Sequence, residues 1–200
     1  EYYHEGLMQD CITQDNIHGT HLAVRHLWNL GHRRIGMLAR ASGYGGFHST
    51  ARRAAFVTGL LQFGQVEPAA IGQSERFDAE GGRESARLLL DLPRPPTALV
   101  LAHLEMGAGL FDELAARGLT PGADVSVVAW GTPSTKAECL GHTRWKDLPL
   151  DLVSWSREEM GRLVVRMLQA RHLNPLIPVM RISVPATLHA QGSCVQATGK

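Results

Sequence analysis

Residues 41–53, ASGYGGFHSTARR, place three glycines among side chains that can hold a ligand. The rings of Tyr44 and Phe47 can stack on a flat molecule, and His48 and Arg52 can hydrogen-bond to it. The stretch follows an apolar run, RIGMLA, and precedes a helical pattern, which is where many folds bind phosphate. Three interpretations compete: a nucleotide loop, a loop for a different ligand, and a turn whose glycines only bend the chain.

Neither of two phosphate-binding motifs fits this loop. A Walker loop needs a lysine followed by Ser or Thr after its second glycine, whereas Phe47 and His48 follow Gly46 here. The dinucleotide fingerprint, counted from Gly43, needs a third glycine where His48 stands. It also needs a carboxylate about twenty residues further on, where the chain has LLQFGQ. A nucleotide site is therefore disfavoured, and the other two interpretations stay open.

Hydrophobic spacing predicts the elements that must position this loop. Apolar residues recur with a helical period over residues 17–30, 49–64, 81–92, 105–119 and 156–171. Continuous apolar runs predict buried strands over residues 33–39, 97–102 and 124–130. Residues 131–147 break the pattern and are predicted to be irregular, and residues 179–193 alternate as an edge strand does. Together they predict an α/β fold, a parallel sheet with helices on both faces.

In such a sheet, ligands bind beyond the carboxyl ends of the strands. Residues 41–48, 103–105 and 130–134 follow the three predicted strands, so we expect them to converge. The candidate ligand-binding residues are therefore Tyr44, Phe47, His48, Arg52, His103 and Trp130. Their mixture of aromatic and hydrogen-bonding groups suits a small polar organic ligand.

Bulk composition narrows the class of protein. The 200 residues carry a formal net charge of +1, without the basic footprint of a DNA-binding domain. Apolar runs are too short to cross a bilayer, and the first residues lack a signal pattern. Three widely spaced cysteines favour reduced thiols in the cytoplasm. Because no methionine begins the chain, we expect a fragment or a trimmed chain.

Metal and catalytic groupings are weak. His18 and His21 lie one helical turn apart, but neither a cysteine nor a carboxylate completes a set with them. Cys139 and His142 are at most a weak dyad, and the neighbouring Glu158 and Glu159 point in different directions on a helix. We therefore expect no metal, no cofactor and no enzymatic activity.

A resemblance to a known family runs along the chain. The segment DNIHGTHLAVRHLWNLGHRRIGMLA resembles the effector-binding domain of lac-repressor-type transcription regulators. Later segments of that domain are similar to RRAAF, PPTALVLA and RGLTPGADVSVVAW. Its crossover resembles PLDLVSWSREEMG, and its closing strand resembles VPATLHAQGS. The resemblance extends from about residue 11 to 194. The matching positions of the first segment are Asp15, Asn16, Gly19, Ala23, His26, Leu27, Gly31, His32 and Ile35.

The resemblance implies a periplasmic-binding-protein-like fold of type I, with two hinged lobes and a small-molecule effector between them. Residues 1–14 would form the lead-in and hinge crossing, and 15–147 the second lobe. Residues 148–177 would hold the crossover helix of the first lobe, and 178–200 the closing strand and tail. Most of the first lobe and a DNA-binding head would lie upstream of Glu1. The full-length protein would be a cytoplasmic homodimer that binds operator DNA through that head.

Departures from the family pattern bear on the effector, which the resemblance implies is a sugar or a related polar metabolite. His103 and Leu104 stand where the family usually has Asn-Asp, and Gly131 where it often has Asp. Those residues commonly hold sugar hydroxyls, so their loss weakens the case for a simple sugar. Arg52 is retained, with Ala55 at a usual glycine. We expect Arg52 to be the main polar anchor; the alternative is a surface arginine at a helix start.

Four functions compete on this basis. Effector sensing by a transcription regulator is favoured, and a solute-binding protein for membrane transport, which has the same fold, is the main alternative. The LGHRRI segment and three unpaired cysteines argue against transport. An enzyme is disfavoured because no catalytic set assembles, and a degenerate homologue without a ligand is the fourth reading.

Overall fold

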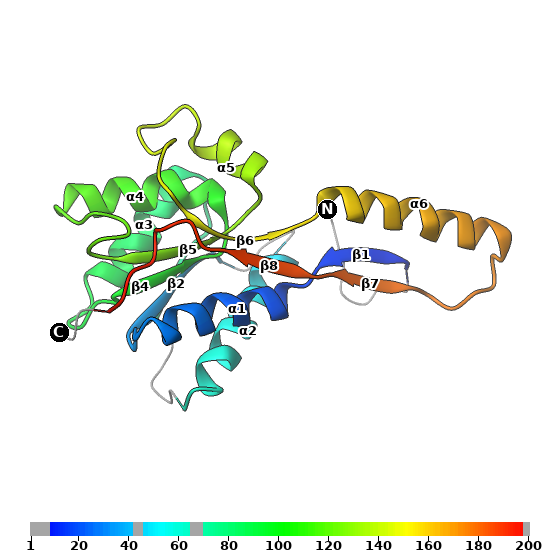
Figure 1. Cartoon of the computed structure of the whole chain (residues 1–200), viewed down its shortest axis with the longest axis horizontal. Coiled ribbons are helices and arrows are strands. Elements are labelled where there is room, and N and C mark those ends of the chain that lie inside the picture. The colour runs from blue at the N-terminus through cyan, green and yellow to red at the C-terminus, as the bar shows by residue number, and fades with distance from the viewer. Residues whose placement is uncertain (1–8, 42–45, 65–69, 198–200) are drawn as a thin grey trace.

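A computed structural model of the chain describes residues 9–41, 46–64 and 70–197, which form two sheets of unequal size (Figure 1). The larger sheet has six strands in the order β3-β2-β4-β5-β6-β8. Its strands are β2 Ile35–Arg40, β3 Ala70–Ser74, β4 Ala98–Leu101, β5 Ser126–Trp130, β6 Asp151–Trp155 and β8 Ala186–His189. Five of them run parallel, and β8 pairs antiparallel with β6 at one edge. The predicted parallel sheet is confirmed, and so is an edge strand near the end of the chain.

Helices cover both faces of this sheet (Figure 1). Helices α1 Asn16–Asn29 and α2 Phe47–Leu61 lie on one face, and α3 Ala79–Leu90, α4 Gly107–Ala116 and α5 Pro133–Leu140 on the other. Alternate residues of β2 separate the two cores, because side chains of a strand point to opposite faces. Met37 packs with Leu27 of α1 and Phe56 of α2, whereas Leu38 packs with Leu89 and Phe111 beneath α3 and α4.

The smaller sheet and one long helix form an arm that extends from this body (Figure 1). Strands β1 Cys11–Gln14 and β7 Arg181–Val184 pair in parallel, and α6 Arg157–Leu173 packs against β1. Among the described residues of α6, only Met160 and Met167 are buried. The chain passes between arm and body at three single residues: Asp15, Ser156 and Pro185.

Several elements differ from the sequence-based prediction. Residues 131–147, predicted to be irregular, contain the helix α5. Thr132 caps this helix by accepting a hydrogen bond from the backbone N–H of Thr135 at 3.2 Å, and Pro133 is its first residue. A capping Thr followed by Pro is a start signal that hydrophobic periodicity does not detect. Strands β1, β3 and β6 were also not predicted, and the alternating end of the chain is two strands in different sheets.

Over the described ranges, no helix is both long enough and apolar enough to cross a membrane.

Candidate functional site

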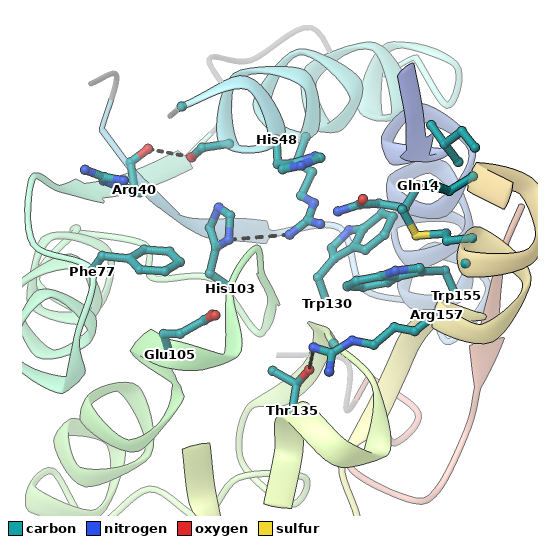
Figure 2. Close-up of a pocket in the computed structure, with 18 residues that line it drawn as sticks. Gln14, Arg40, His48, Phe77, His103, Glu105, Trp130, Thr135, Trp155 and Arg157 are labelled. Atoms are coloured by element: carbon teal, nitrogen blue, oxygen red, sulfur yellow. Dashed lines mark hydrogen bonds between the residues drawn. The ribbon is translucent and has the colours of Figure 1, made fainter. Parts of the chain in front are cut away.

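A pocket of about 1070 Å³ lies where the carboxyl ends of β2, β4 and β5 face the first turns of α6 (Figure 2). The three segments predicted to converge all contribute to its wall. Their lining residues are Gly46, His48, His103, Glu105, Trp130 and Gly131. Across from them, β1 contributes Gln14, and α6 contributes Arg157, Met160 and Val164. The pocket therefore lies between the body and the arm.

Four of the six predicted residues line this pocket: His48, Arg52, His103 and Trp130. Phe47 is not among the lining residues, and its ring lies edge-on to His48 at 5.3 Å between centroids. Tyr44 lies outside the described residues. These four residues therefore form part of the wall that a molecule in the pocket would face.

Arg52 lines the pocket and is only 3% exposed, so the alternative of a surface arginine is wrong. Its guanidinium lies 4.1 Å from the centroid of the Trp130 ring, in cation–π contact. Its Nε donates to Asn16 Oδ1 at 2.9 Å, and Nη1 donates to the carbonyl oxygen of Ala102. By contrast, Arg53 is half-buried, is not among the lining residues and donates to Gln73.

Trp130 is the platform that holds Arg52. The indole is 1% exposed, and its Nε1 donates to Thr20 Oγ1 of α1 at 3.2 Å. A Cβ at Gly19 would lie 2.4 Å from the Trp130 ring, so only glycine lets α1 come this close. The geometry assigns the ring a supporting position beneath the guanidinium.

A hydrogen-bond chain fixes the protonation of the two pocket histidines. Because Asn16 Oδ1 accepts from Arg52, Asn16 Nδ2 must be the donor to His48 Nδ1, 3.0 Å away. Nη1 of Arg52 is 3.5 Å from His103 Nδ1, and a guanidinium offers only donors. Both rings therefore accept at Nδ1, which leaves the proton of each neutral imidazole on Nε2.

Burial lowers the pKa of His103 well below its ordinary value, and the neighbouring positive charge of Arg52 lowers it further. The ring is therefore neutral at physiological pH. Its centroid lies 5.0 Å from that of Phe77 in an edge-on contact, so the imidazole is held between Phe77 and Arg52 (Figure 2).

Unpartnered polar atoms are concentrated at this pocket. Across the described residues, four buried side-chain atoms lack a hydrogen-bond partner: Gln14 Oε1, Arg40 Nε, Ser85 Oγ and His103 Nε2. Three of the four belong to lining residues. Buried polar groups in proteins are almost always paired, so three unpaired atoms around one cavity mark it as incomplete without a bound molecule or water.

Sequence reasoning missed several lining residues. Arg40 ends β2, directly before the glycine loop, and the rule about strand ends would have included it. Gln14 and Arg157 belong to the arm, whose strand β1 was not predicted. Arg157 Nη2 donates to Thr135 Oγ1 of α5 at 2.9 Å, which ties α6 to the pocket rim. Nothing in the local pattern around α5 or β1 indicated this contact.

An apolar residue fills the place of the two missing carboxylates. Leu104 is fully buried, and a Cβ at Gly131 would lie 2.1 Å from Leu104 Cδ1. The two departures from the family pattern are therefore coupled in space: the leucine takes the room that a side chain at 131 would need.

A second polar cluster lies away from the pocket. In the part of the chain that the structure describes, His26, Asp151 and Cys194 form a group whose potential ligand atoms lie within 4.8 Å of one another. Asp151 Oδ1 accepts the backbone N–H groups of residues 191–193 at 2.7, 2.7 and 3.1 Å, and Oδ2 lies 3.1 Å from His26 Nε2. Hydrogen bonding thus accounts for this cluster as an anchor of the chain end. His18 and His21 do not belong to it.

The charge state of this cluster supports an anchoring role. Burial alone would raise the pKa of Asp151, but hydrogen bonds from His26 and from the backbone of residues 191 and 192 outweigh burial and lower the pKa to about 2. The carboxylate is therefore ionised at physiological pH. Elsewhere, burial beside Glu105 and Glu138 raises the pKa of the Cys139 thiol to about 11, which makes it a poor nucleophile.

Comparisons with known proteins agree on one family. The model of the periplasmic binding protein-like domain matches residues 24–194. The HTH-type transcriptional repressor CytR of Escherichia coli (strain K12) is 29% identical over 164 residues, 80% of this chain and 45% of the repressor. Among solved structures, a LacI transcriptional regulator from Rhodococcus species has a TM-score of 0.79 at 25% identity and covers 96% of this chain and 67% of its own. A complex of the transcriptional regulator CelR with cellobiose has a TM-score of 0.76 at 25% identity, over 93% of this chain and 54% of its own.

The curated relatives are longer than this chain, which spans about half their length. Those relatives are named as repressors of transcription and not as enzymes, in agreement with the sequence-based prediction.

Proposed function

The chain belongs to the periplasmic-binding-protein-like domain family of lac-repressor-type regulators, and from this premise we propose that it senses a small-molecule effector for a transcription regulator. The observation that carries the proposal is the incomplete pocket between body and arm. Arg52, His103 and His48 surround a cavity large enough for a metabolite, and three buried polar atoms of its wall lack partners. Such a wall is complementary to a bound polar molecule.

In this proposal the body is the second lobe, predicted over residues 15–147 and here joined by β6 and β8. The arm is the part of the first lobe that this chain contributes, with its crossover helix α6 in the predicted range 148–177. Residues 1–14 would be the lead-in and hinge crossing, and residues 178–200 the closing strand and tail. Effector binding would change the angle between the lobes and shift a two-state equilibrium. Since the relatives are about twice as long, contact with operator DNA would come from a part of the protein outside this chain, in a cytoplasmic homodimer.

Arg52 is the proposed anchor, with His103 and His48 as further polar contacts and Trp130 as the platform. The test compares Arg52→Ala with Arg53→Ala in the protein as the cell produces it. A metabolite that stabilises the parent protein in a thermal-shift screen is titrated by calorimetry into each variant. Arg52→Ala should weaken binding by about a hundredfold, since a charged hydrogen bond and its geometry are lost. Arg53→Ala should bind as the parent does.

Equal affinity of the Arg52→Ala variant and the parent would overturn the assignment of Arg52. Failure of every metabolite to stabilise the parent protein would overturn the sensing function itself.

A further inference from the structure

The charge on the pocket wall is unbalanced. Three arginines, Arg40, Arg52 and Arg157, line the cavity, and Glu105 is the carboxylate among its described lining residues. Arginine stays protonated at any physiological pH, so the wall is cationic. The whole chain, with a formal net charge of +1, has no comparable excess. The excess is therefore local to the pocket.

The unpartnered atoms at one end of the pocket are donors. Arg40 Nε carries a hydrogen, and so does His103 Nε2, because His103 Nδ1 faces the guanidinium of Arg52. Both lie beside the same ring: Arg40 is 5.5 Å from the centroid of Phe77, which contacts His103 edge-on (Figure 2). Two donors at one end of the pocket, one of them charged, match an oxyanion with several acceptor lone pairs.

The opposite end of the pocket offers an acceptor. Gln14 Oε1 is buried without a partner, and Figure 2 shows the Gln14 side chain reaching toward the middle of the pocket, between His48 and Trp130. An acceptor of this kind needs a hydroxyl or N–H group from the ligand. The two ends therefore require different groups on one molecule.

Neutral sugars present the opposite requirement. Their hydroxyls are held best by bidentate acceptors such as carboxylates, and here Leu104 occupies the space where such a side chain could project from position 131. The wall is therefore rich in donors and poor in acceptors.

We propose that the effector is an anionic polyhydroxylated compound, with its carboxylate or phosphate group at Arg40 and His103 and a hydroxyl group at Gln14. This inference rests on the proposed sensing function and specifies its ligand class. Sugar acids and sugar phosphates share the required chemistry. Arg40 and His103 are the residues that distinguish them from neutral sugars.

The test uses matched ligands that differ only in the anionic group. Glucose, glucuronate and glucose 6-phosphate differ at carbon 6, and ribose and ribose 5-phosphate form a second pair. Each is titrated calorimetrically into the protein as the cell produces it, at low and at high salt. At least one anionic member should bind more than about tenfold tighter than its neutral counterpart, the ratio that one charged hydrogen bond supplies. That advantage should shrink as salt is added.

The anion that binds more tightly identifies the charged group that the pocket recognises. Tighter binding of glucuronate indicates a carboxylate, and tighter binding of a sugar phosphate indicates a phosphate; either supports the inference. Arg40→Gln should remove most of the anionic advantage. Arg94→Gln, at an exposed arginine outside the pocket, is the matched control and should leave that advantage unchanged. If Arg40→Gln fails to fold, His103→Gln replaces it.

A neutral sugar that binds as tightly as its anionic counterparts would overturn the inference and leave the sensing function in place. An anionic advantage that survives Arg40→Gln and His103→Gln would overturn the assigned position. Absence of binding by every member, with no stabilising metabolite in the wider screen, would count against the sensing function as well.

Discussion

Two buried polar clusters in this chain both contain histidine, and they differ in how many of their hydrogen bonds are made. Around Asp151, every hydrogen bond of the carboxylate is used: three backbone N–H groups, His26 and the thiol of Cys194 all point at it. Around Arg52, the chain of hydrogen bonds ends in unpartnered atoms at His103 and, nearby, at Arg40. The carboxylate of the first cluster has all its hydrogen-bond partners within the protein, whereas the second cluster still has buried atoms that could bond to a ligand.

The comparison separates stability from function. A saturated cluster contributes to folding because each buried group has regained the hydrogen bonds it lost with water. An unsaturated cluster costs stability, and it persists where the missing partner comes from a ligand. Histidine occurs in both clusters, so its presence alone would not have distinguished them.

Removing the centre of the saturated cluster should have the largest effect on stability. Asp151→Ala leaves His26 and the backbone of residues 191–193 without their acceptor, and we expect the free energy of unfolding to fall by about 3–5 kcal/mol. Urea denaturation followed by circular dichroism measures it. Asp147→Ala, at an exposed carboxylate, is the control and should change stability by less than about 0.5 kcal/mol. A loss for Asp151→Ala no larger than that of the control would mean that saturation does not stabilise this fold.

An intermediate effect on the free energy of unfolding is expected at Gly131, where Leu104 excludes a carboxylate from the pocket. Gly131→Ala places a Cβ against Leu104 Cδ1 and should cost about 1–3 kcal/mol through overpacking. In the background of Leu104→Ala, where the obstructing atoms are gone, the same change at 131 should cost much less. A double-mutant cycle of thermal or urea unfolding measures the coupling. Additive effects of the two changes would show that the residues do not compete for one space.

The smallest effect on stability should come from the unsaturated cluster. His103→Leu removes a buried donor that has no partner, so we expect the free energy of unfolding to change by less than about 1 kcal/mol, with either sign. The same urea titration measures it beside Asp151→Ala. A loss as large as that of Asp151→Ala would erase the distinction between the two clusters.

Much of the body follows from the sequence, and the reasons are local. Apolar runs such as ALVL of β4 and SVVAW of β5 are buried on both faces and cannot be exposed strands. The position of His48 and His103 beyond strand ends followed from the parallel sheet alone. These predictions needed no information from distant parts of the chain.

The features that could not be predicted from the sequence depend on pairing between distant segments of the chain. Strand β1, with only four residues, is defined by its partner β7, about 170 residues away. Gln14 therefore became a pocket residue only when that pairing was known. Trp130 was predicted as a ligand contact, and its 1% exposure beneath Arg52 depends on the approach of Gly19, which lies more than 100 residues earlier.

The three single-residue passages at Asp15, Ser156 and Pro185 have a mechanical consequence. In the proposed two-lobed arrangement, three links of one residue each would favour bending of the arm against the body over sliding or twisting. Two pocket residues of the arm are the immediate chain neighbours of these links: Gln14 precedes Asp15, and Arg157 follows Ser156. A molecule that contacts Gln14 and Arg157 from within the pocket would therefore act directly beside the proposed pivot. Its binding would favour rotation of the arm relative to the body.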